Sequence, residues 1–166
     1  MKKILTALLS TILMLLSASA AADTTSIELA QLRFNQSVVE LDSQEAACDT
    51  QRQILPADLF DLFKITTEQR RTALKYFHDR ALASCSEGAL KDFLVAAASL
   101  SAVAPETATD IQEATHLIIQ TQISLLKSES EFNRLDPQLR EQLLQLPNLK
   151  APFKLLESGR LLVEPT

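Results

Sequence analysis

Residues 27–48 read IELAQLRFNQSVVELDSQEAAC, and this stretch decides the class of the fold. Its main apolar row recurs every seven residues, at Ile27, Phe34, Leu41 and Cys48. Ala30 and Val38 fill the same face, and charged residues such as Glu28, Arg33 and Glu40 lie elsewhere. This spacing keeps one apolar stripe on one face of a helix. The stretch therefore predicts a long amphipathic helix.

The C-terminal part of this helix admits two interpretations. Asp42 and Glu45 have the spacing of an N-cap residue and its N3 partner, so the helix either continues through Asp42 or bends and restarts there. Pro56 ends any continuation, because proline lacks the backbone donor that a helix interior needs.

Further helices follow along the chain. Pro56 suits the first turn of a brief helix over residues 56–63, and we expect its apolar side chains to fill the core: Leu59, Phe60, Leu62 and Phe63. Thr66 and Gln69 form a capping box that starts a helix reaching about Cys85. A break at residues 86–88 separates it from a helix over residues 89–103.

The last third of the chain contains two more helix starts and an ambiguous tail. A long helix opens near Thr107 or Thr109, and Asp136 followed by Pro137 starts a helix that stops at Pro147. The tail, with Gly159 and an apolar run after it, fits a small hairpin or a last helical turn followed by an extended arm.

Composition supports an all-α fold. Glycine occurs only twice and tryptophan is absent, whereas tight turns between strands need glycine. We expect a single domain over residues 23–166, built as a disulfide-stapled bundle of about five helices, with the C-terminal hairpin or arm as a possible addition.

The first 22 residues have the pattern of a secretory signal peptide. Lys2 and Lys3 precede an apolar run over residues 4–16, and a small-residue segment then offers cleavage after Ala20 or Ala22. The apolar run is too short to span a membrane, and no cysteine follows the cleavage region to carry a lipid. We therefore expect a periplasmic or secreted protein with no membrane span in its mature chain.

Two cysteines in an exported chain predict one disulfide, between Cys48 and Cys85. Cys85 lies far from the expected start of its helix near Thr67, so a hairpin with a short turn cannot bring the sulfur atoms together. We expect residues 49–66 to carry the chain back along the bundle, so that the second helix runs parallel to the first.

The charge of the chain bears on its partners. The full chain has a formal net charge of −5, and loss of Lys2 and Lys3 with the leader makes it −7. Nucleic acids and anionic lipids require a basic face, so neither is an expected partner. A cationic protein or peptide is compatible with the charge, although the same charge can serve solubility alone.

No catalytic, metal or cofactor site is predicted. Glu113 and His116 form one E-x-x-H pattern, but a carboxylate-bridged metal centre needs a second copy, and Lys75 stands three residues before His78. His78 and Asp79 are adjacent on a helix and are not expected to face each other. Neither a G-x-S-x-G segment nor a glycine-rich phosphate loop is present.

Residues 65–70, with the sequence ITTEQR, are similar to the L-T-x-x-Q signature of the periplasmic helical chaperones of the Spy and CpxP family. The similarity covers six residues, and the capping box accounts for the same pattern. No binding residue is transferred from that family.

These observations favour a non-enzymatic protein- or peptide-binding module: chaperone-like, an adaptor or an inhibitor. The alternatives are a small helical envelope hydrolase and a carrier of a small apolar ligand. The apolar run Leu161, Leu162 and Val163 is the candidate docking element, with packing onto the bundle as the other interpretation. The oligomeric state and the identity of the partner are not predicted.

Overall fold

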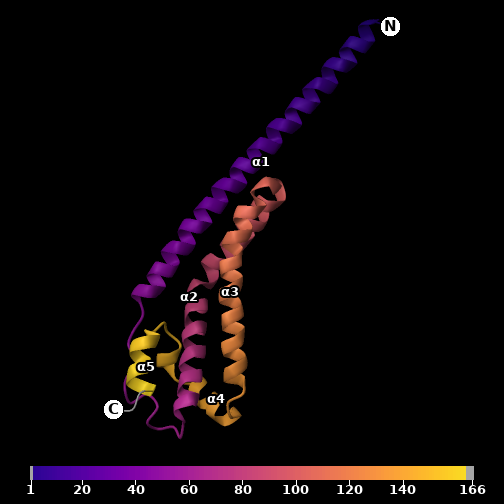
Figure 1. Cartoon of the computed structure of the whole chain (residues 1–166). Helices are drawn as coiled ribbons and strands as arrows, with labels where there is room; N and C mark the ends of the chain where they lie inside the picture. Colours follow the sequence, from indigo (N-terminus) through magenta and orange to yellow (C-terminus); the bar gives the residue numbers. More distant parts are fainter. Residues whose placement is uncertain (1, 164–166) are drawn as a thin grey trace.

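The computed structural model describes the backbone of residues 2–163 and the side chains of residues 24–107, 111–113, 115–116 and 118–163. This part of the chain is built from helices, without a β-strand (Figure 1). The elements in order are α1 (Lys2–Thr50), α2 (Thr67–Val103), η1 (Pro105–Thr107), α3 (Ala108–Asn133), α4 (Pro137–Leu144), η2 (Pro147–Leu149) and α5 (Leu155–Val163). The all-α fold, the five α-helices and the disulfide are as expected. The expected leader, residues 1–22, lies outside the described side chains.

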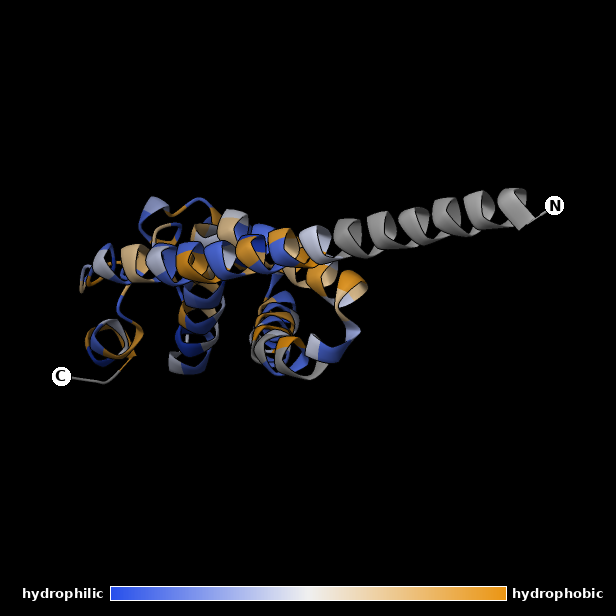
Figure 2. Cartoon of the chain, turned by 90° about the horizontal axis from the view of Figure 1, so that it is seen from above, coloured by the Kyte–Doolittle hydropathy of each residue, from blue (hydrophilic) through white to orange (hydrophobic). Residues whose placement is uncertain are grey.

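Helix α1 runs through Asp42 without a restart, so the continuous interpretation is correct. Apolar and polar segments alternate along its described part (Figure 2). The side chains that recur every seven residues turn toward α2, because only that face of the helix can be removed from water by a neighbour.

Helix α2 starts as the sequence predicts and ends much later. The Thr66 hydroxyl accepts from the Gln69 N–H at 3.2 Å, and the Gln69 side chain accepts from the Thr66 N–H at 2.9 Å. The predicted break at residues 86–88 is wrong. Gly88 lies inside one continuous helix, and its backbone is not left-handed. One glycine lowers the stability of a helix only modestly, and the contacts of the helix on either side of it outweigh this loss.

Helices α1 and α2 run antiparallel, which corrects the expected parallel arrangement. Cys48 near the end of α1 pairs with Cys85 in the middle of α2, and Phe34 lies against Phe93 with ring centroids 5.6 Å apart. Residues 51–66 do not return along α1. They continue past the end of α1, so α2 starts well beyond that end (Figure 1). The midpoint of α2, at Cys85, is therefore the part that lies beside Cys48.

The connector over residues 51–66 forms turns in place of the predicted brief helix. The Leu59 N–H donates to the Pro56 carbonyl and the Phe63 N–H donates to the Phe60 carbonyl, which are the hydrogen bonds of turns. Phe60 is fully buried, as expected, and Leu59 and Phe63 are partly buried. Leu62 is 95% exposed, so its predicted core position is wrong.

The C-terminal segment holds the connector in place. Gln53 pairs with Phe153 in an isolated parallel bridge, and the Lys154 N–H donates to the Gln53 carbonyl at 2.9 Å. The buried Ser158 hydroxyl accepts from the Leu55 N–H at 3.1 Å. Hydrogen bonds between segments about one hundred residues apart thus replace a helical connection.

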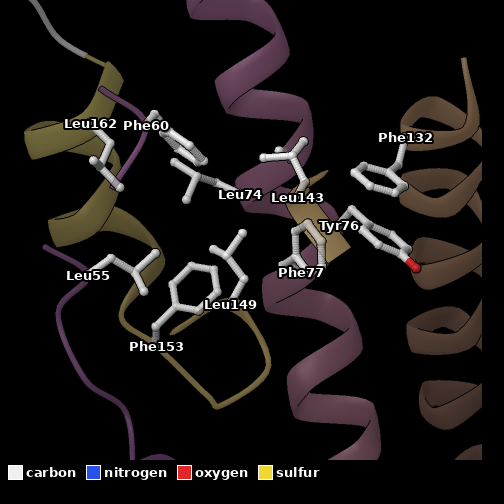
Figure 3. Close-up of a cluster of buried hydrophobic side chains, with 11 residues drawn as sticks. Leu55, Phe60, Leu74, Tyr76, Phe77, Phe132, Leu143, Leu149, Phe153 and Leu162 are labelled. Carbon is white, nitrogen blue, oxygen red and sulfur yellow. The ribbon is translucent and has the colours of Figure 1, made fainter. Parts of the chain in front are cut away.

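Two apolar clusters form the core. The lower cluster joins the connector, the first half of α2, the end of α3, α4, η2 and α5 (Figure 3). Its fully buried large side chains are Leu55, Phe60, Leu74, Leu143, Leu149, Phe153 and Leu162. The upper cluster joins α1, the second half of α2 and the start of α3 through Ala30, Phe93, Ala97, Leu100, Ala104 and Ile111. Small residues at this contact let α1 and α2 approach closely.

Helices α3 and α4 follow the predicted starts. Thr107 stands at the N-cap of α3, but its hydroxyl donates to the Ala104 carbonyl in place of accepting a capping bond. The Asp136 carboxylate accepts from the N–H groups of Gln138 and Leu139, and Pro137 is the first residue of α4. Aromatic stacking of Tyr76 on Phe132, with centroids 4.1 Å apart, joins α2 to α3.

The described part of the tail is helical over residues 155–163, so neither a hairpin nor an extended arm forms there. Helix α5 passes through Gly159 and ends at Val163. Arg70 holds this helix on α2 by donating to the Leu162 carbonyl at 2.9 Å. The apolar run is therefore part of a helix that packs on the lower cluster. In the described part of the chain, none of the helices combines the length and hydropathy required to cross a membrane.

Candidate functional site

The disulfide joins α1 to α2 at the boundary between the two clusters. Cys48 and Cys85 form the predicted pair, with Cα atoms 6.0 Å apart. Cys48 is only 3% exposed. The Gln44 side chain also donates to the Cys85 carbonyl at 2.9 Å, so α1 is attached to α2 at this level by a covalent bond and a hydrogen bond.

A groove of about 650 Å³ lies beside this attachment, between α1, α2 and α3. Helix α2 packs against both of its neighbours, whereas α1 and α3 make little direct contact with each other. Helix α2 therefore forms the floor, and the other two helices form the walls. The apolar lining consists of Leu41, Ala46, Leu82, Ala83, Leu90, Ile118 and Leu125.

The α1 wall carries a row of carboxylates. Asp42, Glu45 and Asp49 line the groove and are exposed, and their spacing of three and four residues puts them on one face of α1. Asp49 pairs with Arg52 at 2.9 Å. Among the described residues, Asp42 and Glu45 have no ion-pair partner. The rim of the groove is therefore acidic.

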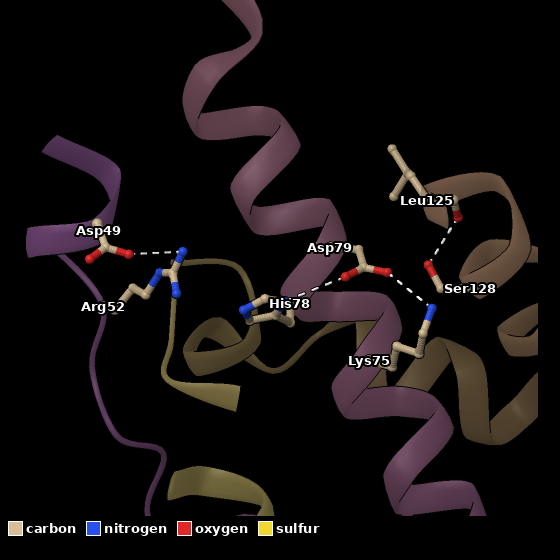
Figure 4. A network of polar contacts seen from close by, with 7 residues as sticks. All are labelled: Asp49, Arg52, Lys75, His78, Asp79, Leu125 and Ser128. Carbon is tan, nitrogen blue, oxygen red and sulfur yellow. Dashed lines mark hydrogen bonds and ion pairs between the residues drawn. The ribbon is translucent and has the colours of Figure 1, made fainter. Parts of the chain in front are cut away.

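Asp79 on α2 adds a fourth carboxylate to the lining of the groove. Figure 4 shows the polar contacts of this side chain. Asp79 lies 3.3 Å from Lys75 Nζ and 3.4 Å from His78 Nδ1, and the Ser128 hydroxyl is a further neighbour. Burial by itself would raise the pKa of Asp79, but hydrogen bonds from His78, Ser128 and Lys75 and the charge of Lys75 outweigh it and lower the pKa. Asp79 is thus held as a carboxylate.

The histidines do not lie in the groove. His78 contacts Asp79 at 3.4 Å, which corrects the expectation that the two side chains do not face each other, and its ring lies edge-on to Phe153. It is not among the groove-lining residues. Glu113 and His116 are exposed on α3, where His116 contacts Gln120. No group of three or more potential metal ligands occurs among the described side chains.

The three residues predicted as a docking element have different environments. Leu162 is fully buried in the lower cluster, and Val163 packs against that cluster. Leu161 is 51% exposed and is the member of the run that presents the most surface. Docking of a partner at this helix remains a prediction. The apolar surface available for it is smaller than the three-residue run predicted, because Leu162 is buried and Val163 packs on the lower cluster.

The groove itself was not predicted, although part of its signal is in the sequence. The acidic residues at positions 42, 45 and 49 are spaced like one face of a helix, and this pattern could have indicated an acidic stripe. The side chains of α3 that face this stripe could not be identified, because their position depends on how α2 packs between the two walls.

Comparison with known protein families, with curated proteins and with solved structures gave no match to this chain.

Proposed function

We propose that this chain is an exported, non-enzymatic binding protein whose α1–α2–α3 groove holds a segment of another protein or a peptide. The observation that carries the proposal is the groove of about 650 Å³ with an apolar floor and an open rim. Recognition of a peptide segment uses such grooves, because apolar anchors leave water while the rim sets orientation. Export is inferred from the leader pattern and agrees with a chain that contains a disulfide and no free cysteine.

A photo-cross-linking amino acid at Ser124 tests the proposal in cells. Ser124 lines the groove and is exposed, and Ser130 is an exposed serine on the same helix that does not line it. We expect a discrete adduct from position 124 and none from position 130. Equal adducts from both positions, or none from either, would contradict a binding role for the groove.

A blocking variant sharpens this test. Ala46 is exposed on the α1 wall, so Ala46→Trp fills the groove without entering the core. Ala98→Trp makes the same change at an exposed position of α2 outside the groove. We expect A46W to remove the adduct from position 124 and A98W to leave it unchanged.

The volume of the groove also lies in the range of small-ligand sites, and this favours the carrier of an apolar ligand as a second candidate. Native mass spectrometry of protein purified without detergent distinguishes the two. A bound lipid-sized mass that A46W removes would favour the carrier, whereas ligand-free protein that still forms the adduct favours the peptide-binding module.

A further inference from the structure

We infer that the segment held by the groove is a basic amphipathic helix, bound through its apolar face to the floor and through its lysines or arginines to the acidic rim. This inference rests on the proposed binding function and names the chemistry of the partner. It follows from the shape of the groove, the carboxylate row and the charges around them.

The shape suits a helix. The floor extends along α2 from Asp79 to Leu90, which is about 16 Å at the rise of an α-helix and matches about three turns of a bound helix. A helix in this position would lie between α1 and α3 and complete a packed group of four. Its apolar residues would follow the spacing of three and four that such grooves recognise.

The charges of the residues that line the groove favour a positively charged helix as the partner. Four carboxylates line the groove, and Arg52 is the single basic residue among the lining residues. Arg52 is already paired with Asp49, and Lys75 and His78 already contact Asp79. Asp42 and Glu45 are left without a cation in the described part of the chain, and they lie one helical turn apart. Two basic side chains one turn apart on a bound helix would match them.

A second copy of this chain does not fit the same groove. Each copy carries the same acidic row, and the chain as a whole is acidic, with a formal net charge of −5. Two grooves brought together would bury like charges against each other. Electrostatic complementarity therefore points to a cationic partner.

Titration of labelled synthetic helices tests the inference. The first peptide has a leucine stripe at helical spacing flanked by lysines, the second has glutamate at each lysine position, and the third has the composition of the first in an order that destroys the stripe. We expect the lysine peptide to bind at low salt and to weaken as salt rises. The glutamate and permuted peptides are expected to bind at least tenfold more weakly.

Protein variants locate the binding. D42N/E45Q removes the two unpaired carboxylates and keeps the shapes of the side chains, and we expect it to bind the lysine peptide about three- to tenfold more weakly. D58N/E141Q is the matched control, because Asp58 and Glu141 are exposed, do not line the groove and lose the same two charges. The control is expected to bind as the wild type does. Circular dichroism and melting temperatures check that both variants remain folded.

The outcomes separate this inference from the proposed function. Equal binding of lysine and glutamate peptides, or no effect of D42N/E45Q, would overturn the charge preference. If A46W still abolished that binding, the groove would remain a peptide site of another specificity. Equal binding of the permuted peptide would overturn recognition of a helical face. Failure of all three peptides together with an adduct at Ser124 would overturn the inference and leave the proposed function standing.

Discussion

Whether a single apolar side chain of the connector is buried depends on which surface packs against it. Phe60 and Leu62 lie two residues apart in the connector, and both are apolar, yet the first is fully buried and the second is 95% exposed. Phe60 points into the lower cluster, whereas the turns of the connector leave the Leu62 side chain in solvent. Local apolarity therefore indicates that some of these residues are buried without identifying which.

Asp79 supports a prediction about pH at this scale. Its pKa in the folded protein lies below the usual aspartate value of 3.8, so ionisation stabilises the fold fully above that value and the contribution is lost as the pH falls below it. We expect Asp79→Asn to lower the free energy of unfolding by about 1 to 2 kcal/mol at pH 7 and by less near pH 2 to 3. Urea unfolding across this pH range measures the difference.

The matched control for Asp79 is Asp58→Asn, at an exposed aspartate of the connector. It is expected to change stability by less than about 0.5 kcal/mol. A D79N deficit that stayed constant from pH 7 to pH 2 would show that the carboxylate charge of Asp79 does not stabilise the fold.

The starts of α2 and α4 are local events, and the sequence predicts both, whereas the expected starts at Pro56 and at residue 89 do not occur. The capping box at Thr66 and the Asp136 cap before Pro137 are both present, because each depends on side chains within three residues of the helix end. Helix ends are predicted less well. The break at residues 86–88 is absent, since the contacts of α2 with α1 and α3 continue past it.

Gly88 provides a test of this continuous helix. It lies in the interior of α2 with an ordinary helical backbone, and a methyl group added there would meet no heavy atom within 4 Å. Gly88→Ala is therefore expected to raise the free energy of unfolding by about 0.5 to 1 kcal/mol, because alanine loses less backbone freedom on folding. Chemical denaturation with an unchanged slope measures it. A destabilised variant would indicate that the helix is interrupted at this position.

The whole molecule consists of two apolar clusters joined by α2, and the disulfide lies between them. The described residues of α1 contribute to the upper cluster and not to the lower one. The attachment of α1 to the rest of the chain thus depends on the upper cluster and on the bond between Cys48 and Cys85. The groove shares this dependence, because α1 forms one of its walls.

Removal of the disulfide is expected to destabilise the upper cluster more than the lower one. The bond spans 37 residues of sequence, so the variant Cys48→Ala/Cys85→Ala should lose about 4 kcal/mol of stability in the chain-entropy description. Hydrogen exchange should show the largest loss of protection in residues 24–47, and a smaller one in the lower cluster, to which the described residues of α1 contribute no side chain. Equal loss in both regions would show that the two clusters unfold as one unit.

The sequence by itself determined the helical class, the starts of α2 and α4 and the amphipathic face of α1, because each depends on residues that are close together in the sequence. It also determined the disulfide, because the chain has only two cysteines. Only the tertiary structure decided the antiparallel direction of α2, the helical tail and the groove. These depend on where residues 51–66 dock, and that is set by hydrogen bonds from the Lys154 N–H to the Gln53 carbonyl and from the Leu55 N–H to the Ser158 hydroxyl. Contacts across a hundred residues leave no periodicity in the sequence, so the acidic stripe of α1 could be recognised from the sequence but not the cavity beside it.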